Sequence, residues 1–429
     1  MPESWVIRGG RVVDQGGERT ADVVIADGRV VEVGPKLTAD AELDAAGCVV
    51  APGLVDLHVH LREPGMEDAE TIETGARAAA LGGFTAVVAM PNTTPPQDDP
   101  AVVASVLASG ARSCCDVHAA GAITRGREGV ELAPMGELHQ LGVRIFTDDG
   151  ACVDSAGVMR AALEYAASLP GAVVAQHAED GSLAGTGHMH EGEWSSRLGI
   201  PGRPAAAEDT IVARDCILAA LTGSRVHFLH LSTAGSVELV RAAKARGLPV
   251  TAEAAPHHFH LTEAACASFD PRFKVNPPLR TDADVAAVKA GLADGTIDAI
   301  ATDHAPHRTE AKERPFEEAP PGMLGLETAL ALTLGELVEP GVLTLGDALA
   351  RLSWGPAAIA GLADHGRPVE AGAVANLCVF DPEARWTVVA EQLASRARNT
   401  PYAGRELHGR VRHTILRGEP VVVDGSATR

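Results

Sequence analysis

Eight short apolar runs, separated by stretches of helical periodicity, constrain the fold of this chain more than any other feature. The runs lie at residues 54–60, 84–90, 117–123, 143–147, 172–177, 226–230, 249–254 and 299–303. Ala- and Leu-rich stretches at residues 69–81, 155–168, 205–221, 236–245 and 284–293 have the apolar spacing of helices. Strands that alternate with helices indicate βαβ units and a parallel sheet, and eight such strands close a barrel. We therefore predict an α/β fold with a TIM-like (β/α)8 barrel.

The two ends of the chain have a different pattern. In roughly the first fifty residues, and again after Gly366, apolar and polar positions alternate between glycine-containing turns. Such alternation is typical of antiparallel strands. We expect the two ends to form one small β-sandwich domain, residues 1–52 plus 366–429, beside a barrel domain of residues 53–365.

Composition narrows the function classes. No apolar run approaches the roughly 20 residues of a membrane-spanning helix, and the N-terminus lacks the layout of a signal peptide, so we predict a cytoplasmic protein with no membrane partner. The formal net charge of −21 argues against nucleic acid as a partner. A small-molecule substrate and a symmetric homo-oligomer are the remaining expectations.

Histidine and aspartate side chains stand at the ends of several apolar runs. They are His58 and His60, Asp148 and Asp149, His177, His230, and Asp303. His58 and His60 are two positions apart in a strand and therefore project to the same side. Active sites of such barrels lie at the C-terminal ends of the strands. Imidazole and carboxylate groups that converge there suit one or two divalent transition-metal ions with positions open for water.

Each of these residues also has a structural explanation. His177 or His230 alone would more often be a buried histidine satisfied by a hydrogen bond, but their shared strand-end position favours metal binding. One residue of the Asp148 and Asp149 pair is expected to form a turn or cap the following helix, and the other to bridge the metal ions. Asp303 would be a buried carboxylate, which is unfavourable without a cation or a hydrogen-bonding partner. We predict that Asp303 is the general acid/base.

Two polar residues near the strand ends are candidates for substrate binding. Arg62 lies on the same side as His60 if the strand continues, and its guanidinium could bind a carboxylate through two hydrogen bonds. A solvated surface arginine is the alternative. Asn92 could be a turn residue, but its position after the second run favours substrate contact.

Two further features are open to more than one interpretation. Residues 305–322, rich in proline and charge, form either a lid over the substrate or a disordered loop. His257, His258 and His260 follow the seventh run and suggest a third metal site. Support for the metal ligands or packing in the barrel is the preferred interpretation of these histidines.

Taken together, these motifs resemble those of the cyclic amidohydrolases, specifically the class I dihydroorotases, over nearly the whole chain. The resemblance is carried by residues 51–53 (APG), 58–65 (HVHLREPG), 90–93 (MPNT), 146–150 (FTDDG), 276–280 (NPPLR) and 301–307 (ATDHAPH). It implies that His58, His60 and an aspartate hold one zinc ion. His177 and His230 would hold a second, with Asp149 as the shared bridge.

The resemblance also implies roles for other residues. Asp303 approaches the metal closely enough to be counted among its ligands, and it transfers the proton. Substrate contacts are implied for His60, Arg62, Asn92, Asn276, His307, Pro321 and Gly322.

The lysines separate subgroups of this superfamily. Many amidohydrolases bridge their two metal ions with a carboxylated lysine. The only lysines here are Lys36, Lys244, Lys274, Lys289 and Lys312, so none lies between His60 and His177. This agrees with an aspartate bridge and counts against the usual hydantoinase and allantoinase arrangement.

The resemblance implies dihydroorotase activity, the reversible hydrolysis of L-dihydroorotate to N-carbamoyl-L-aspartate in pyrimidine biosynthesis, by metal-activated hydroxide with Asp303 as acid and base. Two alternatives remain. One is an allantoinase or hydantoinase. The other is an inactive, dihydroorotase-like structural partner of aspartate carbamoyltransferase. An inactive partner should have lost metal ligands, whereas this sequence retains every one.

Overall fold

Eight parallel strands lie in the middle of the chain in the computed structural model, which describes residues 2–428. They are β6 (Leu54–Val59), β7 (Phe84–Ala89), β8 (Asp116–Ala119), β9 (Ile145–Phe146), β10 (Val173–Gln176), β13 (Val226–Phe228), β14 (Val250–Ala254) and β15 (Ala299–Ile300). Each overlaps one of the predicted apolar runs. The α/β class is confirmed.

The parallel strands form two sheets that are linked to each other at both edges. One sheet has the order β6-β7-β8, and the other β15-β14-β13-β10-β9. Single parallel bridges join Gly121, after β8, to Phe146 in β9, and Val59 in β6 to His304, after β15. Because neighbouring strands run parallel, their C-terminal ends meet at one edge, where the predicted site residues lie.

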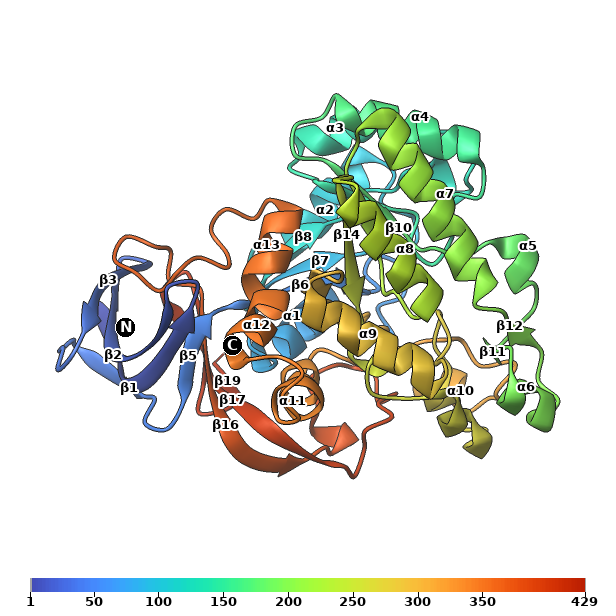
Figure 1. Cartoon of the computed structure of the whole chain (residues 1–429). Coiled ribbons are helices and arrows are strands. Elements are labelled where there is room, and N and C mark those ends of the chain that lie inside the picture. Colours follow the sequence, from blue (N-terminus) through green and yellow to red (C-terminus); the bar gives the residue numbers. More distant parts are fainter. Residues whose placement is uncertain (1, 429) are drawn as a thin grey trace.

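All five predicted helices are present (Figure 1). They are α1 (Ile72–Leu81), α4 (Ala156–Ala167), α7 (Ala206–Thr222), α8 (Ala234–Ala245) and α9 (Asp282–Asp294). Four of them begin after a Thr or Ser whose side chain accepts a backbone N–H of the first turn, namely Thr71, Ser155, Thr233 and Thr281. A further long helix, α2 (Pro100–Gly110), is capped by Asp99 and was not predicted.

The remaining elements are short. They are η1 (Arg125–Arg127), α3 (Met135–Gln140), α5 (Gly181–Ala184), β11 (Met189–His190), α6 (Glu193–Leu198), β12 (Gly202–Arg203), η2 (Pro256–His258), η3 (Glu263–Ser268), η4 (Pro271–Phe273), α10 (Thr309–Lys312), α11 (Ala329–Thr333), η5 (Leu334–Val338), α12 (Leu345–Leu349), η6 (Ala350–Trp354), α13 (Gly355–Ala360) and η7 (Ala390–Gln392). Within the described residues, no helix is both long enough and apolar enough to cross a bilayer.

Strands from both ends of the chain join in one nine-stranded sheet, with the blue N-terminal and red C-terminal strands beside the parallel region (Figure 1). Its strands are β1 (Ser4–Asp14), β2 (Gly17–Ala26), β3 (Arg29–Gly34), β4 (Ala41–Asp44), β5 (Val49–Pro52), β16 (Leu377–Thr387), β17 (Glu406–Leu416), β18 (Glu419–Val423) and β19 (Ser426–Ala427). The two ends meet where β16 pairs antiparallel with β5.

The C-terminal strands pack directly against the parallel region. Cys378 and Val411, on β16 and β17, belong to the same apolar cluster as the buried face of α1. The contact is close, because a Cβ on Gly83, whose φ is 88°, would lie 2.5 Å from the Cys378 sulfur. The Thr414 hydroxyl also donates to the Ala80 carbonyl at 2.7 Å. The two regions therefore share a core.

Candidate active site

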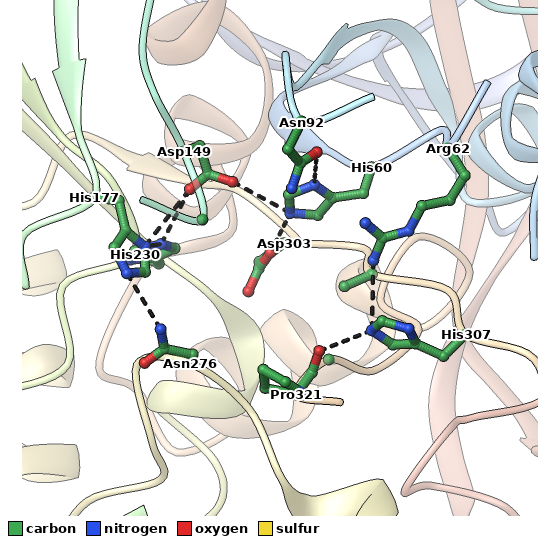
Figure 2. Close-up of a pocket in the computed structure, with 13 residues that line it drawn as sticks. His60, Arg62, Asn92, Asp149, His177, His230, Asn276, Asp303, His307 and Pro321 are labelled. Atoms are coloured by element: carbon green, nitrogen blue, oxygen red, sulfur yellow. Dashed lines mark hydrogen bonds and ion pairs between the residues drawn. The ribbon is translucent and has the colours of Figure 1, made fainter. Parts of the chain in front are cut away.

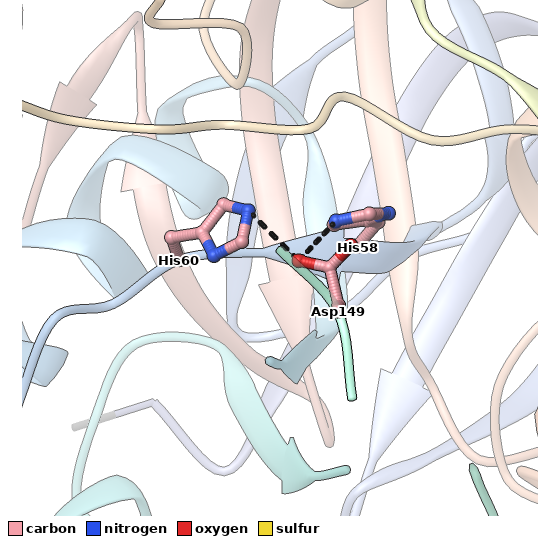
Figure 3. Close-up of side chains that lie close together, drawn as sticks. All are labelled: His58, His60 and Asp149. Atoms are coloured by element: carbon pink, nitrogen blue, oxygen red, sulfur yellow. Dashed lines mark ion pairs between the residues drawn. The ribbon is translucent and has the colours of Figure 1, made fainter. Parts of the chain in front are cut away.

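Asp149 lies between two pairs of histidines. Its Oδ2 is 3.3 Å from His58 Nε2 and 3.5 Å from His60 Nε2, and dashed lines mark these two ion pairs in Figure 3. Its Oδ1 is 3.6 Å from both His177 Nδ1 and His230 Nε2. Two atoms that bind one zinc ion at about 2.1 Å in a tetrahedral arrangement lie about 3.4 Å apart. The spacing of these side chains therefore suits two metal sites that share Asp149.

Unsatisfied polar atoms at the same place also favour a metal. His58 Nε2 and Asp149 Oδ1 are buried and have no hydrogen-bond partner. His177 Nδ1 and His230 Nε2 face each other at 3.0 Å. Buried polar atoms without partners are unfavourable, and a cation next to each pair of histidines would satisfy all of them. The residues present therefore fit a centre of one or two divalent ions.

The orientation of His58 and His60 is set by hydrogen bonds to their other ring nitrogen. His58 Nδ1 lies 2.9 Å from Glu253 Oε1, and His60 Nδ1 lies 2.9 Å from Asn92 Oδ1. Both partners accept, so both Nδ1 atoms carry the proton and both Nε2 atoms are left for a metal. Asn92 thus orients His60 as well as lining the pocket.

Glu253 on β14 was not predicted from the sequence. Its second oxygen accepts from His227 Nε2 at 3.0 Å. Burial alone raises the pKa of Glu253, but the hydrogen bonds from His227 and His58 outweigh it and hold the pKa at about 2. Glu253 is therefore a carboxylate at neutral pH. The available sequence signal was a single acidic residue inside an otherwise apolar run.

Replacing Glu253 by Gln should weaken metal binding by about 10- to 100-fold, because the variant loses one of the two acceptors that orient His58 and His227. Competition with a chelator, followed by metal analysis, measures this affinity. Glu208→Gln is a matched control: Glu208 is 2% exposed and accepts the backbone N–H groups of Ser232 and Thr233. Equal metal affinity in Glu253→Gln and the wild type would contradict the role of Glu253.

Asp148 has a different role from Asp149. One of its oxygens accepts the backbone N–H of Ile123 at 2.8 Å and of Thr124 at 3.0 Å, and the other accepts the Thr124 hydroxyl. It therefore joins the segments that follow β8 and β9. Of the two roles expected for one of the aspartates, the turn is present, since the Ala151 N–H donates to the Asp148 carbonyl at 2.9 Å, whereas α4 is capped by Ser155.

Asp303 follows β15 with a positive φ of 49°. Its Oδ1 lies 3.0 Å from His60 Nε2 and 3.5 Å from His58 Nε2. Burial by itself raises the pKa of Asp303, but its close contact with His60 and the neighbouring His58 and His230 hold the pKa below its usual value. The carboxylate is thus ionised and faces the same histidines as Asp149.

These groups border one cavity of about 230 Å³. Figure 2 shows Asp149, His177 and His230 on one side, Arg62 and His307 on the other, and Asp303 between them. The lining residues are His60, Arg62, Asn92, Asp149, Gly150, His177, His230, Asn276, Asp303, Ala305, His307, Pro321 and Gly322. Every predicted substrate contact is among them, whereas the buried His58 is not. The volume suits a small cyclic molecule rather than a drug-sized ligand.

Arg62 is a buried cation without an acidic partner. The strand does not continue to Arg62, because β6 ends at Val59 and Arg62 has a φ of 64°. Its guanidinium donates to the Pro306 carbonyl at 3.0 Å and lies 3.5 Å from His307 Nε2. Burial lowers the pKa of Arg62 to about 10, so it stays charged at neutral pH. No ion pair joins it to a carboxylate within residues 2–428, which leaves it available for an anionic ligand.

Asn276 lies on the opposite wall of the cavity. Its amide nitrogen is 3.3 Å from His177 Nε2, and its amide oxygen is buried without a partner. His258 Nε2 donates to the Pro277 carbonyl at 3.0 Å and so helps to place this loop. His258 therefore supports the loop that carries Asn276.

The segment 305–322 is a folded loop that contains α10. The Lys312 ammonium donates to the Pro320 carbonyl at 2.9 Å, and Phe316 is 3% exposed. His307 Nε2 donates to the Pro321 carbonyl at 2.8 Å. The Gly322 N–H donates to the Lys274 carbonyl at 2.8 Å. The disordered-loop alternative is therefore wrong.

His260 belongs to a network outside the cavity. Its Nδ1 lies 2.6 Å from Glu336 Oε1, and its Nε2 accepts from Arg405 at 2.5 Å. Within the described residues, none of His257, His258 and His260 belongs to a group spaced for metal binding. The structure thus supports the packing interpretation of His260.

Replacing Glu336 by Gln should lower stability in a pH-dependent way. The His260 hydrogen bond, helped by Lys289, lowers the pKa of Glu336 from 4.5 to about 2 against the effect of burial. The ionised carboxylate therefore stabilises the fold above pH 4.5, and this contribution is lost as the pH falls through about 2. We expect a loss of about 1 kcal/mol at pH 7 after solvent screening.

Urea denaturation between pH 7 and pH 3 measures this difference in unfolding free energy. It should stay constant down to about pH 5 and shrink below pH 4.5. Glu339→Gln is the control, because the Glu339 side chain is 67% exposed and 3.8 Å from its partner His408. A difference that grows at low pH would contradict the role of Glu336.

Comparison with known proteins identifies the family to which the chain belongs. A family model described as dihydro-orotase-like matches residues 47–236. The dihydroorotase of Streptomyces coelicolor is 52% identical over 427 residues, 99% of each chain, and that of Pelotomaculum thermopropionicum is 52% identical over 423 residues, 98% of each chain. Among solved structures, the L-hydantoinase of Arthrobacter aurescens has a TM-score of 0.90 at 25% identity, with 100% of this chain and 98% of that chain covered. The chain therefore belongs to the dihydroorotase family of the amidohydrolase superfamily.

Proposed function

We propose that this protein is a metal-dependent dihydroorotase that interconverts L-dihydroorotate and N-carbamoyl-L-aspartate. The observation that carries the proposal is one small cavity with a metal-binding set at one side and an unpaired guanidinium, Arg62, at the other. The substrate has the same two chemical features, a cyclic amide to be hydrolysed and a free carboxylate to be recognised. About 50% identity to dihydroorotases over nearly the whole chain supports the same activity.

The architecture behind the proposal is a (β/α)8 barrel, residues 53–365, and a small β-sandwich domain, residues 1–52 plus 366–429. Eight parallel strands whose two sheets are bridged at both edges support the barrel. The pairing of β5 with β16 supports a single terminal domain built from both ends.

We assign the metal ligands to two groups. His58, His60 and Asp149 would hold one zinc ion, and His177 and His230 a second that shares Asp149. Such a metal would lower the pKa of a bound water towards about 7 and would polarise the carbonyl of the cyclic amide.

Asp303 is assigned as the general acid/base. The ionised carboxylate accepts a proton from the attacking water and returns it to the ring nitrogen as that nitrogen leaves. Its place beside His60 Nε2, at 3.0 Å, keeps it near the assigned metal ligands. In the reverse direction the same carboxylate takes a proton from the ureido nitrogen that closes the ring.

Arg62 would hold the substrate carboxylate, with His307 beside it and Asn276 on the facing wall. Its planar fork can donate two parallel hydrogen bonds to a carboxylate, and a lysine ammonium cannot reproduce that geometry.

Replacing Arg62 by Lys should therefore lower kcat/KM for L-dihydroorotate by about 10- to 100-fold, mostly through KM, because the variant keeps the charge and loses a charge-assisted hydrogen bond. Steady-state hydrolysis assays measure both constants. Unchanged KM in Arg62→Lys would show that this guanidinium does not bind the carboxylate.

The test of the function is turnover of L-dihydroorotate by the zinc-loaded protein, followed by ultraviolet absorbance, beside hydantoin and allantoin. Turnover of L-dihydroorotate at a kcat/KM far above those of the other two supports the proposal. Preference for hydantoin or allantoin would favour the alternative that the protein is an allantoinase or hydantoinase. That alternative is supported by the 25% identity to a solved hydantoinase. No turnover despite bound metal would favour an inactive partner of aspartate carbamoyltransferase.

Assembly and location stay predictions. We expect a homo-oligomer in the cytoplasm and a possible complex with aspartate carbamoyltransferase. Sedimentation of the purified protein, alone and with that enzyme, tests both associations.

A further inference from the structure

Asn399 uses its whole side-chain amide on the loop that borders the cavity. Its Nδ2 donates to the carbonyls of Ala305 at 3.0 Å and Gly322 at 3.1 Å. Its Oδ1 accepts the backbone N–H of His307 at 3.1 Å. Because the amide NH2 group must face the two carbonyls and the amide oxygen must face the N–H, these contacts fix the orientation of the Asn399 amide. Asn399 comes from the segment between η7 and β17 and is 3% exposed.

The three hydrogen-bond partners of Asn399 lie at the two ends of the loop 305–322. Ala305 and His307 are at its start, and Gly322 is at its end. Ala305, His307 and Gly322 all line the substrate cavity. The two ends are in close contact, since a Cβ on Gly322 would lie 2.7 Å from Ala305 Cβ and 2.9 Å from His307 Nε2. Without the Asn399 amide, two buried carbonyls and one N–H at this junction would lose a partner.

The junction also sets the position of the His307 ring. That ring donates to Pro321 from one end of the loop and lies beside Arg62, the assigned carboxylate ligand. The backbone of His307 is held by Asn399, and Pro321 precedes Gly322, which is also held by Asn399. The Asn399 hydrogen bonds reach neither Asp149 nor Asp303, so they act on the substrate side of the cavity.

We propose that Asn399 is a positioning residue for substrate binding, whose amide clamps both ends of the loop 305–322 and thereby holds the His307 and Pro321 wall beside Arg62. The clamp itself follows from the contacts of the chain, and its effect on substrate rests on the proposed function. It makes a C-terminal segment responsible for the shape of the carboxylate-binding side of the cavity.

The chain offers a matched control in Asn376. This asparagine is also 3% exposed and also ties two backbone segments together, since its Nδ2 donates to the Asp364 carbonyl at 2.9 Å and its Oδ1 accepts the Arg417 N–H at 2.7 Å. It is not among the residues that line the substrate cavity. The two asparagines thus share burial and chemistry but differ in what they hold.

The experiment compares zinc-loaded wild type, Asn399→Asp and Asn376→Asp. Asn399→Asp keeps the shape and the acceptor for His307 but turns a carboxylate oxygen towards the carbonyls of Ala305 and Gly322. We expect KM for L-dihydroorotate to rise by about tenfold while kcat changes by less than about threefold. Hydrogen exchange of peptides within 305–322 should become at least about tenfold faster. Asn376→Asp should change neither quantity, although both variants can lower the melting temperature.

Hydrogen exchange in 305–322 equal to that of the wild type, or the same rise of KM in Asn376→Asp, would overturn the proposal. If Asn399→Asp does not fold, Asn399→Ser replaces it, with the same expectations. The exchange measurement needs no substrate, so it decides whether the clamp exists even when the wild type fails to hydrolyse L-dihydroorotate. Inactive wild type would refute the proposed function, and slow exchange in the Asn399 variants would refute the clamp.

Discussion

Replacing Asp303 by Asn should reduce kcat for L-dihydroorotate by about 10²- to 10⁴-fold and leave the bound metal in place. The amide is nearly the same size as the carboxylate but cannot accept and return a proton. Asp303, although expected as a further metal ligand, is in neither of the two groups of described residues spaced to hold a metal, so both groups stay complete in the variant. Initial rates by ultraviolet absorbance and zinc analysis of the same samples measure the two effects.

The matched control is Asp116→Asn. Asp116 also lies close to a histidine, with Oδ2 3.1 Å from His365 Nε2, much as Asp303 Oδ1 lies 3.0 Å from His60 Nε2. It is not among the residues that line the substrate cavity, so Asp116→Asn should keep the activity. Full activity in Asp303→Asn with metal retained would exclude Asp303 as the acid/base. Loss of both metal and activity would instead make it a ligand.

The positions of the eight parallel strands along the chain could be predicted from the sequence because each is a short apolar run bounded by helical periodicity. The same signal was too weak for short elements. Strand β4 (Ala41–Asp44) has four residues, at the lower limit for recognising alternation, and β19 (Ser426–Ala427) has two, which is below it. Periodicity placed the end of β6 within one residue but could not show the positive φ of Arg62, which lies beyond the strand.

The groups that touch the cavity could be predicted because their side chains have few structural uses at a strand end. The residues that position those groups could not. Glu253 orients His58 across 195 positions of sequence, and Asn399 holds Ala305 across 94. The local sequence around Glu253 or Asn399 does not indicate which residue each one contacts, because these contacts form only when distant strands and loops pack together. For the same reason, spacing alone could not choose between Asp148 and Asp149.

Replacing Asp149 by Asn should abolish metal binding at both sites together, whereas Asp148→Asn should not. Asp149 is the one residue common to the two metal-spaced groups, and its oxygens face His58 and His60 on one side and His177 and His230 on the other. An amide offers one neutral oxygen in place of two that share a negative charge. Because changes in residues that only orient metal ligands already cost about 10- to 100-fold in affinity, loss of the shared ligand should cost more than about 100-fold.

Asp148→Asn separates the loss of a ligand from the loss of local structure. Its oxygens serve only Ile123 and Thr124, so the variant should lose some stability but keep its zinc and most of its activity. Zinc content after dialysis, with turnover of L-dihydroorotate on the same samples, decides the matter. If Asp149→Asn retained one equivalent of zinc per chain, Asp149 would belong to a single site, and the other pair of histidines would need a different anionic partner. If Asp148→Asn lost the metal instead, the assignment of the two adjacent aspartates would have to be reversed.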